Sequence, residues 1–320
     1  MWNNCGIKIS FQISLKVKIV LFTPKLQIKN HLDMHLTPKG KLIAIGGAED
    51  KGTEYENGLT HHTNLNFFEL QILSRVKMEA GGEHSKIEVI TSASSIPEEV
   101  GENYMSAFGK LGCNNAGVIH IKSREEANDP AYLKRLEQCD AVLFSGGNQL
   151  KLSSILGGTE AIRIIQQRYF EEEFVVAGTS AGAMAMSNTM IYQGSSSGAL
   201  LKGEVKLTAG LGFISRVIID SHFDKRGRFG RLAMAVASNP NCIGIGLGED
   251  TGVMIRENNY MEAIGSGLVV IFDGHEIKHS NIADQLDGSP ISIENLIIHV
   301  MTKGNHYTLK ERKFTASVVV

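Results

Sequence analysis

The sequence predicts an α/β fold: a doubly wound, mostly parallel sheet flanked by helices, with antiparallel C-terminal strands. Short apolar runs recur along the chain, and each is followed by a glycine turn and a stretch with helical spacing. Parallel strands covered by helices on both faces need such continuous apolar runs. After Ile243 the pattern changes to closely spaced strand candidates around a turn. This change indicates that antiparallel strands complete the same sheet.

The individual elements follow from these runs and from residues that begin or end them. Asp129 is a helix N-cap, Gly81-Gly82 is a helix stop, and Glu257-Asn258-Asn259 is a hairpin turn. The expected strands are 42–45, 87–91, 118–121, 141–144, 174–177, 253–255, 260–264 and 268–272, and the expected helices include 98–111, 130–138 and one through Leu65, Phe68, Ile72 and Val76. No repeat or Pro/Gly/Ser-rich linker divides the chain, so residues 34–320 are predicted to form a single α/β domain.

Residues 1–33 are an atypical N-terminal extension. They carry five Lys and a single acid, and they alternate apolar with polar residues from Ile7 to Lys18, as a strand does. Their longest purely apolar run, 19–22, is too short for a secretory signal. Two interpretations remain: an extra edge strand, or upstream sequence outside a natural product that begins at Met34. We favour the second, because Met34 directly precedes the first clear strand pattern.

Composition excludes several classes of protein. Among 320 residues, 32 Lys and Arg oppose 34 Asp and Glu, a net charge of −2, which argues against a general polyanion binder or a basic membrane-surface protein. No window of about 18 apolar residues is present, so no membrane-spanning helix is expected. The four cysteines (Cys5, Cys113, Cys139 and Cys242) lie far apart, so we expect reduced thiols, a cytoplasmic location and no metal or cofactor.

The strongest candidate for catalysis is Gly178-Thr179-Ser180-Ala181-Gly182, a G-x-S-x-G sequence between a predicted strand and an Ala/Met-rich helix. This context is typical of a nucleophile elbow, which lifts a serine hydroxyl out of the sheet. The backbone N–H of Ala181, at the helix start, would then point at a developing oxyanion. The alternative is a glycine turn that only packs or binds a phosphate.

A second glycine turn, Ser145-Gly146-Gly147-Asn148-Gln149, follows the preceding strand. Ligands of doubly wound sheets bind at the carboxyl ends of the strands. Gly147 is therefore a candidate for the second oxyanion donor, and Gln149 for a polar contact with substrate. An ordinary turn that needs glycine for its backbone conformation explains the pattern equally well.

A third group begins at a strand end with Asp220-Ser221-His222 and continues with Arg226, Arg228 and Arg231. The two-residue strand period places Asp220 and His222 on one side, and His222 is a candidate general base. Three arginines so close together in a nearly neutral chain favour recognition of carboxylates, although a solvated helix start is the alternative. Nucleic acid fits less well, because no aromatic residues accompany the arginines.

The strand from Ile243 ends in two acids, Glu249 and Asp250. Either carboxylate is placed to orient His222 in a Ser-His-acid triad. An acid at a strand end is otherwise only a cap. Asp220 is too near His222 in sequence for the spacing usual in an α/β-hydrolase, so we prefer Glu249.

These motifs together resemble the cyanophycinase and aspartyl dipeptidase family of serine peptidases, whose α/β fold is related to the class I glutamine amidotransferases. The resemblance covers about 40–272 and rests on G-G-A-E-D-K, S-G-G-N-Q-L, G-T-S-A-G-A, D-S-H-F-x-x-R-x-R-x-x-R and G-I-G-L-G-E-D-T. The three arginines after the histidine place the chain nearest the cyanophycinase branch.

The resemblance implies a role for each matching residue: Ser180 as nucleophile, His222 as base, Glu249 as orienting acid, and Gly147 and Ala181 as the oxyanion hole. It places Gln149, Asp220, Ser221, Arg226, Arg228 and Arg231 in the substrate pocket. The sequence departs from the family at Ser221, where Gln is common. The shorter side chain keeps the triad intact and can alter how the substrate is held.

The implied activity is hydrolysis of cyanophycin, a poly-aspartate with Arg on each β-carboxyl, to β-Asp-Arg dipeptides through an acyl-enzyme. The predicted partners are a peptide or Asp/Arg polymer and neither nucleic acid nor membrane, with a homodimer left open. An aspartyl or other small-peptide dipeptidase is the first alternative. A non-catalytic α/β protein that binds a ligand through its glycine turns is the second.

Overall fold

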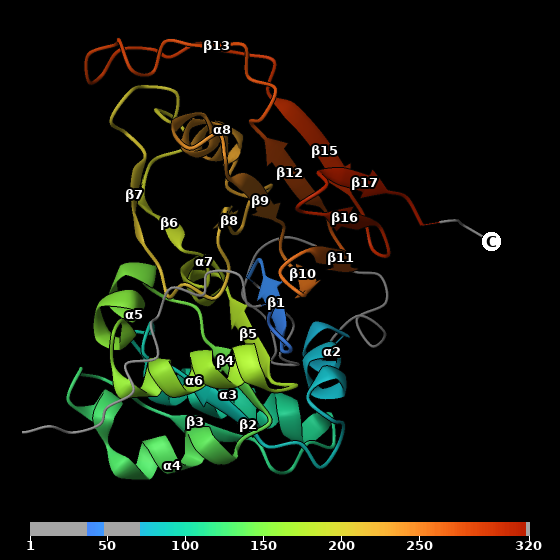
Figure 1. Ribbon diagram of the computed structural model, residues 1–320. Coiled ribbons are helices and arrows are strands. Elements are labelled where there is room, and N and C mark those ends of the chain that lie inside the picture. Colours follow the sequence, from blue (N-terminus) through green and yellow to red (C-terminus); the bar gives the residue numbers. More distant parts are fainter. Residues whose placement is uncertain (1–36, 48–70, 318–320) are drawn as a thin grey trace, which may run out of the picture. The chain divides into compact units, whose positions relative to one another are not determined.

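The computed structural model describes residues 37–47 and 71–317, which all belong to one compact unit of the chain (Figure 1). The predicted extension 1–33, its boundary at Met34, the helix residues Leu65 and Phe68, and residues 48–51 of the first glycine motif lie outside the described residues. Within the part described, no helix is long and apolar enough to cross a membrane.

The central element of the described residues is a nine-stranded sheet. In spatial order its strands are β17 (Lys313–Thr315), β16 (His306–Thr308), β11 (Tyr260–Gly265), β10 (Thr251–Arg256), β1 (Lys41–Ile45), β5 (Val175–Thr179), β4 (Ala141–Phe144), β2 (Ile87–Ile90) and β3 (Gly117–Ile119). On one side of the sheet, the neighbours β1, β5, β4, β2 and β3 pair in parallel. On the other side, the neighbours β1, β10, β11, β16 and β17 pair antiparallel. The predicted fold class is confirmed.

Helices cover both faces of this sheet, as the continuous apolar strands require. Leu42 and Ala44 of β1 belong to one apolar cluster, while Ile43 and Ile45 belong to another. The helices on the side of the first cluster are α4 (Pro130–Gln138), α5 (Gln149–Leu156), α6 (Glu160–Glu171) and α7 (Ala181–Ala185), and those on the side of the second are α2 (Gln71–Glu79) and α3 (Pro97–Lys110). The first cluster also includes α8 (Phe229–Ser238), which packs on a second sheet. The side chain of Asp129 accepts a hydrogen bond from Ala131 N at 2.7 Å, so the predicted N-cap of α4 is confirmed.

Four strands from the C-terminal half of the chain form a second sheet. It has the order β15 (Ile297–Met301), β12 (Val269–Asp273), β9 (Ile243–Leu247) and β8 (Val217–Asp220), and α8 packs against it (Figure 1). The prediction that 268–272 completes the large sheet is wrong, because β12 pairs with β9 and β15. Gly265, with φ of +91°, lets the chain leave the large sheet between β11 and β12.

Two small two-stranded sheets complete the described structure. β6 (Thr189–Gln193) pairs with β7 (Lys206–Ala209), and β13 (His279–Ser280) pairs with β14 (Ile293–Glu294). We refer to residues 189–209 as the β6–β7 hairpin and to residues 281–291, between β13 and β14, as the β13–β14 loop. These segments lie outside the elements that the apolar runs predict.

Candidate active site

Ser180 lies on a sharp turn between β5 and α7, with φ of 51° and ψ of −111°. Glycine is required on both sides of it. A Cβ on Gly178 would lie 2.7 Å from the backbone of Gly182, and a Cβ on Gly182 would overlap the carbonyl oxygen of Phe144. The G-x-S-x-G spacing therefore allows α7 to pack tightly against β4 and β5, while the serine takes a strained conformation of the kind found at functional sites.

His222 and Glu249 extend a line of polar contacts from this serine. Ser180 Oγ lies 3.0 Å from His222 Nε2, and His222 Nδ1 lies 3.2 Å from Glu249 Oε1. With Nδ1 protonated and donating to the carboxylate, Nε2 is left to accept the serine proton. The structure thus places the three residues in one line of polar contacts, and their catalytic roles stay predictions.

These residues come from different sheets. Ser180 follows β5 of the nine-stranded sheet, whereas His222 follows β8 and Glu249 follows β9 of the four-stranded sheet. β8 ends at Asp220, and His222 has φ of 48°. The two-residue period of a strand therefore no longer relates Asp220 to His222.

The Gly46–Gly47 turn after β1 joins the two sheets at this point. Ile45 O accepts from Ser180 N at 2.8 Å, Gly46 O from His222 N at 2.9 Å, and Gly47 O from Asp250 N at 3.0 Å. The ring of His222 packs directly on Gly47, where a Cβ would lie 2.5 Å from Nε2. The sequence patterns assigned no role in the site to this turn beyond its place in the G-G-A-E-D-K motif, although its Gly-Gly pair after a buried strand matches the Gly146-Gly147 turn.

The surroundings of His222 favour the neutral imidazole. Burial is the largest effect and lowers the pKa of His222 below its ordinary value of 6.5, and the charges of Arg226 and Arg228 lower it further. The hydrogen bond to Glu249 opposes this shift and raises the pKa. A neutral imidazole at neutral pH is the form that accepts a proton from a serine.

Of the two predicted oxyanion donors, Ala181 directly follows the serine, and Gly147 belongs to a turn whose Gly146 lies against it. Ala181 begins α7 directly after Ser180 and is buried. Gly146 lies against the serine, because a Cβ there would be 3.4 Å from the Cβ of Ser180 and 3.9 Å from its Oγ. Gly147, with φ of 138°, continues the same turn. The role of the Gly147 and Ala181 N–H groups as oxyanion donors stays a prediction.

Asp220, Arg228 and Arg231 form a buried ionic cluster. Asp220 is fully buried, and it accepts hydrogen bonds from Arg228 Nη1 at 3.0 Å and from Arg231 Nε at 2.8 Å, with a further contact from Arg231 Nη2. Burial lowers the pKa of Arg228 to about 10, which leaves the guanidinium charged at neutral pH. Arg228 Nη1 also donates to Ser221 O at 2.6 Å. The cluster therefore fixes the backbone that leads to His222.

The other predicted substrate residues differ in exposure. Ser221 is buried, with its Oγ 3.3 Å from the sulfur of Met184. Gln149 is half-buried and donates to two carbonyl oxygens of β6. Arg226 is exposed. The substrate roles of all six residues stay predictions, and Arg226 presents the guanidinium that is most accessible to a ligand.

The structure adds one residue that the sequence patterns did not single out. Lys225 Nζ lies 3.2 Å from Glu249 Oε2, the carboxylate oxygen that does not contact His222. A lysine beside an arginine cluster carried no separate signal in the sequence. Among the described residues, no group of three or more His, Cys, Asp and Glu side chains is arranged to hold a metal ion.

The fold is similar to that of a solved peptidase. The crystal structure of a peptidase from an acI-B1 Actinobacterium aligns with a TM-score of 0.59 at 18% identity, and the alignment covers 86% of this chain and 98% of that one. At that identity the match concerns the fold alone. It agrees with the mixed sheet and helical layers described above.

Curated relatives share far more of the sequence. The cyanophycinase of Geminocystis herdmanii is 34% identical over 281 residues, which cover 88% of this chain and 98% of the relative. The cyanophycinase of Trichormus variabilis is 34% identical over 298 residues, covering 92% and 94%. Residues 60–262, which include the elbow, the histidine and the glutamate, match peptidase family S51. The chain therefore belongs to peptidase family S51 and is a hydrolase of the serine-peptidase type.

Proposed function

We propose that this protein hydrolyses cyanophycin to β-Asp-Arg dipeptides with Ser180 as nucleophile, His222 as general base and Glu249 as the acid that orients it. The observation that carries this proposal is the continuous contact from Ser180 Oγ through the imidazole to Glu249, at 3.0 and 3.2 Å. Relatives named cyanophycinase, similar over most of both chains, supply the substrate.

The first half of the reaction forms an acyl-enzyme. Ser180 Oγ attacks the carbonyl carbon of the scissile amide while its proton passes to His222 Nε2, and Glu249 stabilises the imidazolium that results. The N–H groups of Gly147 and Ala181 donate to the oxyanion. When the tetrahedral intermediate collapses, His222 gives the proton to the departing amine and the C–N bond breaks.

The second half releases the product. Water attacks the ester carbonyl as His222 Nε2 takes one of its protons, and the oxyanion forms again at the same two N–H groups. Collapse returns the proton to Ser180 Oγ and frees the carboxylic acid. One water is consumed for each amide bond cleaved, so no other reactant is needed.

Arg226 is the part of this site that we assign to substrate charge. It is exposed, and its backbone N donates to His222 O at 3.0 Å, so the side chain starts close to the base. A planar guanidinium binds carboxylates in a bidentate manner. The free α-carboxylates of the arginines that are linked to the aspartate polymer suit such a group.

We further infer that residues 34–320 act as a single peptidase domain in the cytoplasm, preceded by an extension over 1–33. The free cysteines in the described part of the chain, Cys113, Cys139 and Cys242, are in keeping with a reducing compartment. Dimerisation stays a prediction, because no contact in the structure bears on it.

Incubation with purified cyanophycin tests the activity. The soluble products are separated and identified by mass spectrometry, with the Ser180→Ala variant treated in parallel. β-Asp-Arg from the unaltered enzyme alone supports the proposal. Hydrolysis of small aspartyl dipeptides without any release from the polymer would favour the dipeptidase alternative.

A further inference from the structure

The β6–β7 hairpin begins directly beyond α7 and has two strands. Two strands alone are at best marginally stable in water. Its position must therefore be set by contacts with the rest of the protein. Those contacts involve several of the residues predicted to bind substrate.

Gln149, at the end of the Gly146-Gly147 turn, holds one side of the hairpin. Its Nε2 donates to Ile191 O at 3.1 Å and to Tyr192 O at 3.3 Å. A side-chain amide nitrogen has two N–H groups, so both are used in binding backbone of β6. Gln149 follows Gly147 by two positions, which ties this end of the hairpin to the candidate oxyanion hole.

Arg231 and Arg226 hold the hairpin from the side of the base. Arg231 Nη1 donates to Gly194 O at 3.1 Å, while its other nitrogens bind Asp220. Ser196 Oγ donates to Arg226 O at 2.6 Å. The hairpin is thus fixed both to the turn that precedes the nucleophile and to the segment that carries His222.

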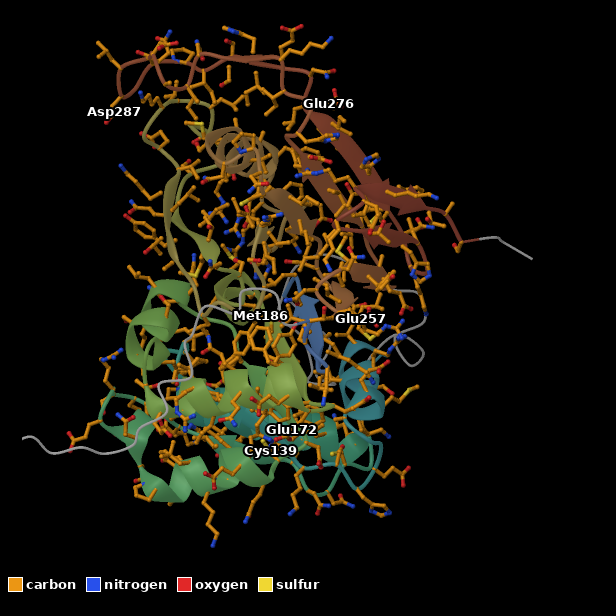
Figure 2. The ribbon with its side chains drawn as sticks, in the orientation of Figure 1. Cys139, Glu172, Met186, Glu257, Glu276 and Asp287 are labelled. Atoms are coloured by element: carbon orange, nitrogen blue, oxygen red, sulfur yellow. The ribbon has the colours of Figure 1, made fainter. Side chains whose placement is uncertain are left out.

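The tip of the hairpin is held by the β13–β14 loop. Lys202 N donates to Ser289 O, and Gly288 N donates to Lys202 O, both at 2.9 Å. Lys202 Nζ donates to Gln285 O at 2.6 Å and to Ala283 O at 3.3 Å. Asp287, labelled in Figure 2 at the outer end of this loop, lies against Gly203, where a Cβ would be 3.1 Å from its carboxyl carbon.

We propose that the β6–β7 hairpin orients the substrate next to Ser180, and that Gln149 and Arg231 are positioning residues that act through it rather than by binding substrate themselves. Gln149 Nε2 and Arg231 Nη1 already donate to carbonyl oxygens of the hairpin, and Arg231 Nε and Nη2 already donate to the carboxylate of Asp220. The surface that the hairpin presents beside Arg226 includes the exposed serines 195–197. Ser195 Oγ and Ser197 Oγ hydrogen-bond each other and Ser196 Oγ donates to Arg226 O, so these hydroxyls hold this surface in place beside Arg226. This inference deepens the proposed function and rests on it.

The test loosens the hairpin at its base and at its tip. Gln149→Met removes the two bonds to β6, and Lys202→Met removes the two side-chain bonds to the β13–β14 loop while the two backbone bonds remain. Gln167→Met, at an exposed glutamine on α6, is the matched control. Amide hydrogen exchange over residues 189–209 reports hairpin order without any substrate, and KM and kcat are measured on cyanophycin or on whichever peptide the unaltered enzyme hydrolyses.

We expect exchange in the hairpin to rise about fivefold to tenfold in both variants. KM should rise about threefold to tenfold with a smaller change in kcat, while the control stays within twofold. Lys202→Met should react with phenylmethanesulfonyl fluoride at the unaltered rate, because that small reagent needs only Ser180 and His222.

Three results would overturn the inference. A higher KM in Gln149→Met with unchanged exchange in the hairpin would mean that Gln149 binds substrate directly. Faster exchange without any change of KM would mean that the hairpin does not orient substrate. Slower reaction of Lys202→Met with the sulfonyl fluoride would place the effect on the nucleophile. Failure of the unaltered enzyme on every peptide would instead reject the proposed function, and the exchange data would still decide the role of Gln149.

Discussion

Lys225 and Glu249 form an ion pair across the carboxylate that orients the candidate base: Lys225 Nζ is 3.2 Å from Oε2, and His222 Nδ1 is 3.2 Å from Oε1. The lysine side chain is 58% exposed, so solvent screens its charge and the pair contributes little to stability. Its contact with the same carboxylate matters more, because a cation bound to Glu249 competes with the imidazolium for that charge and so opposes protonation of His222.

Lys225→Met should shift the acid limb of the kcat/KM profile upward by about half a pH unit or less. Loss of the positive charge lets Glu249 stabilise the imidazolium more strongly, so the base is lost to protonation at a higher pH. Lys225→Arg keeps the charge and should keep the profile. Superimposable profiles for all three proteins at low salt would show that the lysine does not act on the base.

The pH dependence of the unaltered enzyme should reflect the lowered pKa of His222. Because the free imidazole is the active form, the acid limb should have its midpoint below 6.5. Arg226→Met removes a cation that lowers this pKa, so the midpoint should rise. Arg163→Met, at an exposed arginine on α6, should leave it in place. A midpoint above 6.5 in the unaltered enzyme would contradict the buried, neutral histidine.

Ser180→Ala should remove on the order of 10⁶ from kcat, because no other hydroxyl takes the place of the nucleophile. The melting temperature should change little, since the substitution keeps the Cβ and the turn. Rates come from product release, and the melting temperature from circular dichroism. Turnover near the unaltered rate would reject the catalytic role of Ser180.

Gly47→Ala should inactivate the enzyme, while Gly81→Ala should not. Both glycines have similar backbone conformations, with φ of +110° and +116°, so backbone strain of on the order of 1–3 kcal/mol is common to the two variants. They differ in their surroundings: a Cβ on Gly47 would press on the His222 ring, and one on Gly81 would meet nothing within 4 Å. We expect kcat/KM to fall about 100-fold or more in Gly47→Ala alone. Equal activity of the two variants would show that the ring can move aside.

Asp220→Asn should destabilise the fold by about 3–5 kcal/mol, because it leaves two buried guanidinium groups without their shared carboxylate. Urea unfolding measures the change, and Asp284→Asn, at an exposed aspartate, is the comparison. If Asp220→Asn unfolds like the unaltered protein and only KM changes, the predicted direct role of Asp220 in binding substrate becomes the better explanation.

The sequence predicted the parts of the structure that depend on short stretches of chain. Ser180 could be located because a strained elbow needs glycine at Gly178 and Gly182 within five residues, and β4 and β5 are recognisable because strands buried on both faces are continuously apolar. The pairing of β12 with β9 could not be read in this way. An apolar strand carries no mark of which sheet it joins, and that choice depends on segments far away.

The same limit explains what was missed in the site. The link from Gly46 O to His222 N joins residues far apart in the sequence, so the role of the glycine turn appears only in three dimensions. Asp220 was placed beside His222 by the strand period, yet the strand ends at Asp220 and the chain then turns. Its burial with Arg228 and Arg231 depends on the packing of α8, which the spacing of the arginines does not reveal.

The proposed triad is divided between two sheets, so its activity would depend on how the two sheets are placed relative to each other. Ser180 follows a strand of one sheet, and His222 and Glu249 follow strands of the other. The carbonyl groups of residues 45–47 connect the two sides by hydrogen bonds to Ser180, His222 and Asp250. A displacement of about one ångström between the sheets would separate Ser180 from His222 while both sheets kept all their internal pairing. If the proposed triad is correct, we therefore expect heat or distant core substitutions to reduce activity before the protein unfolds.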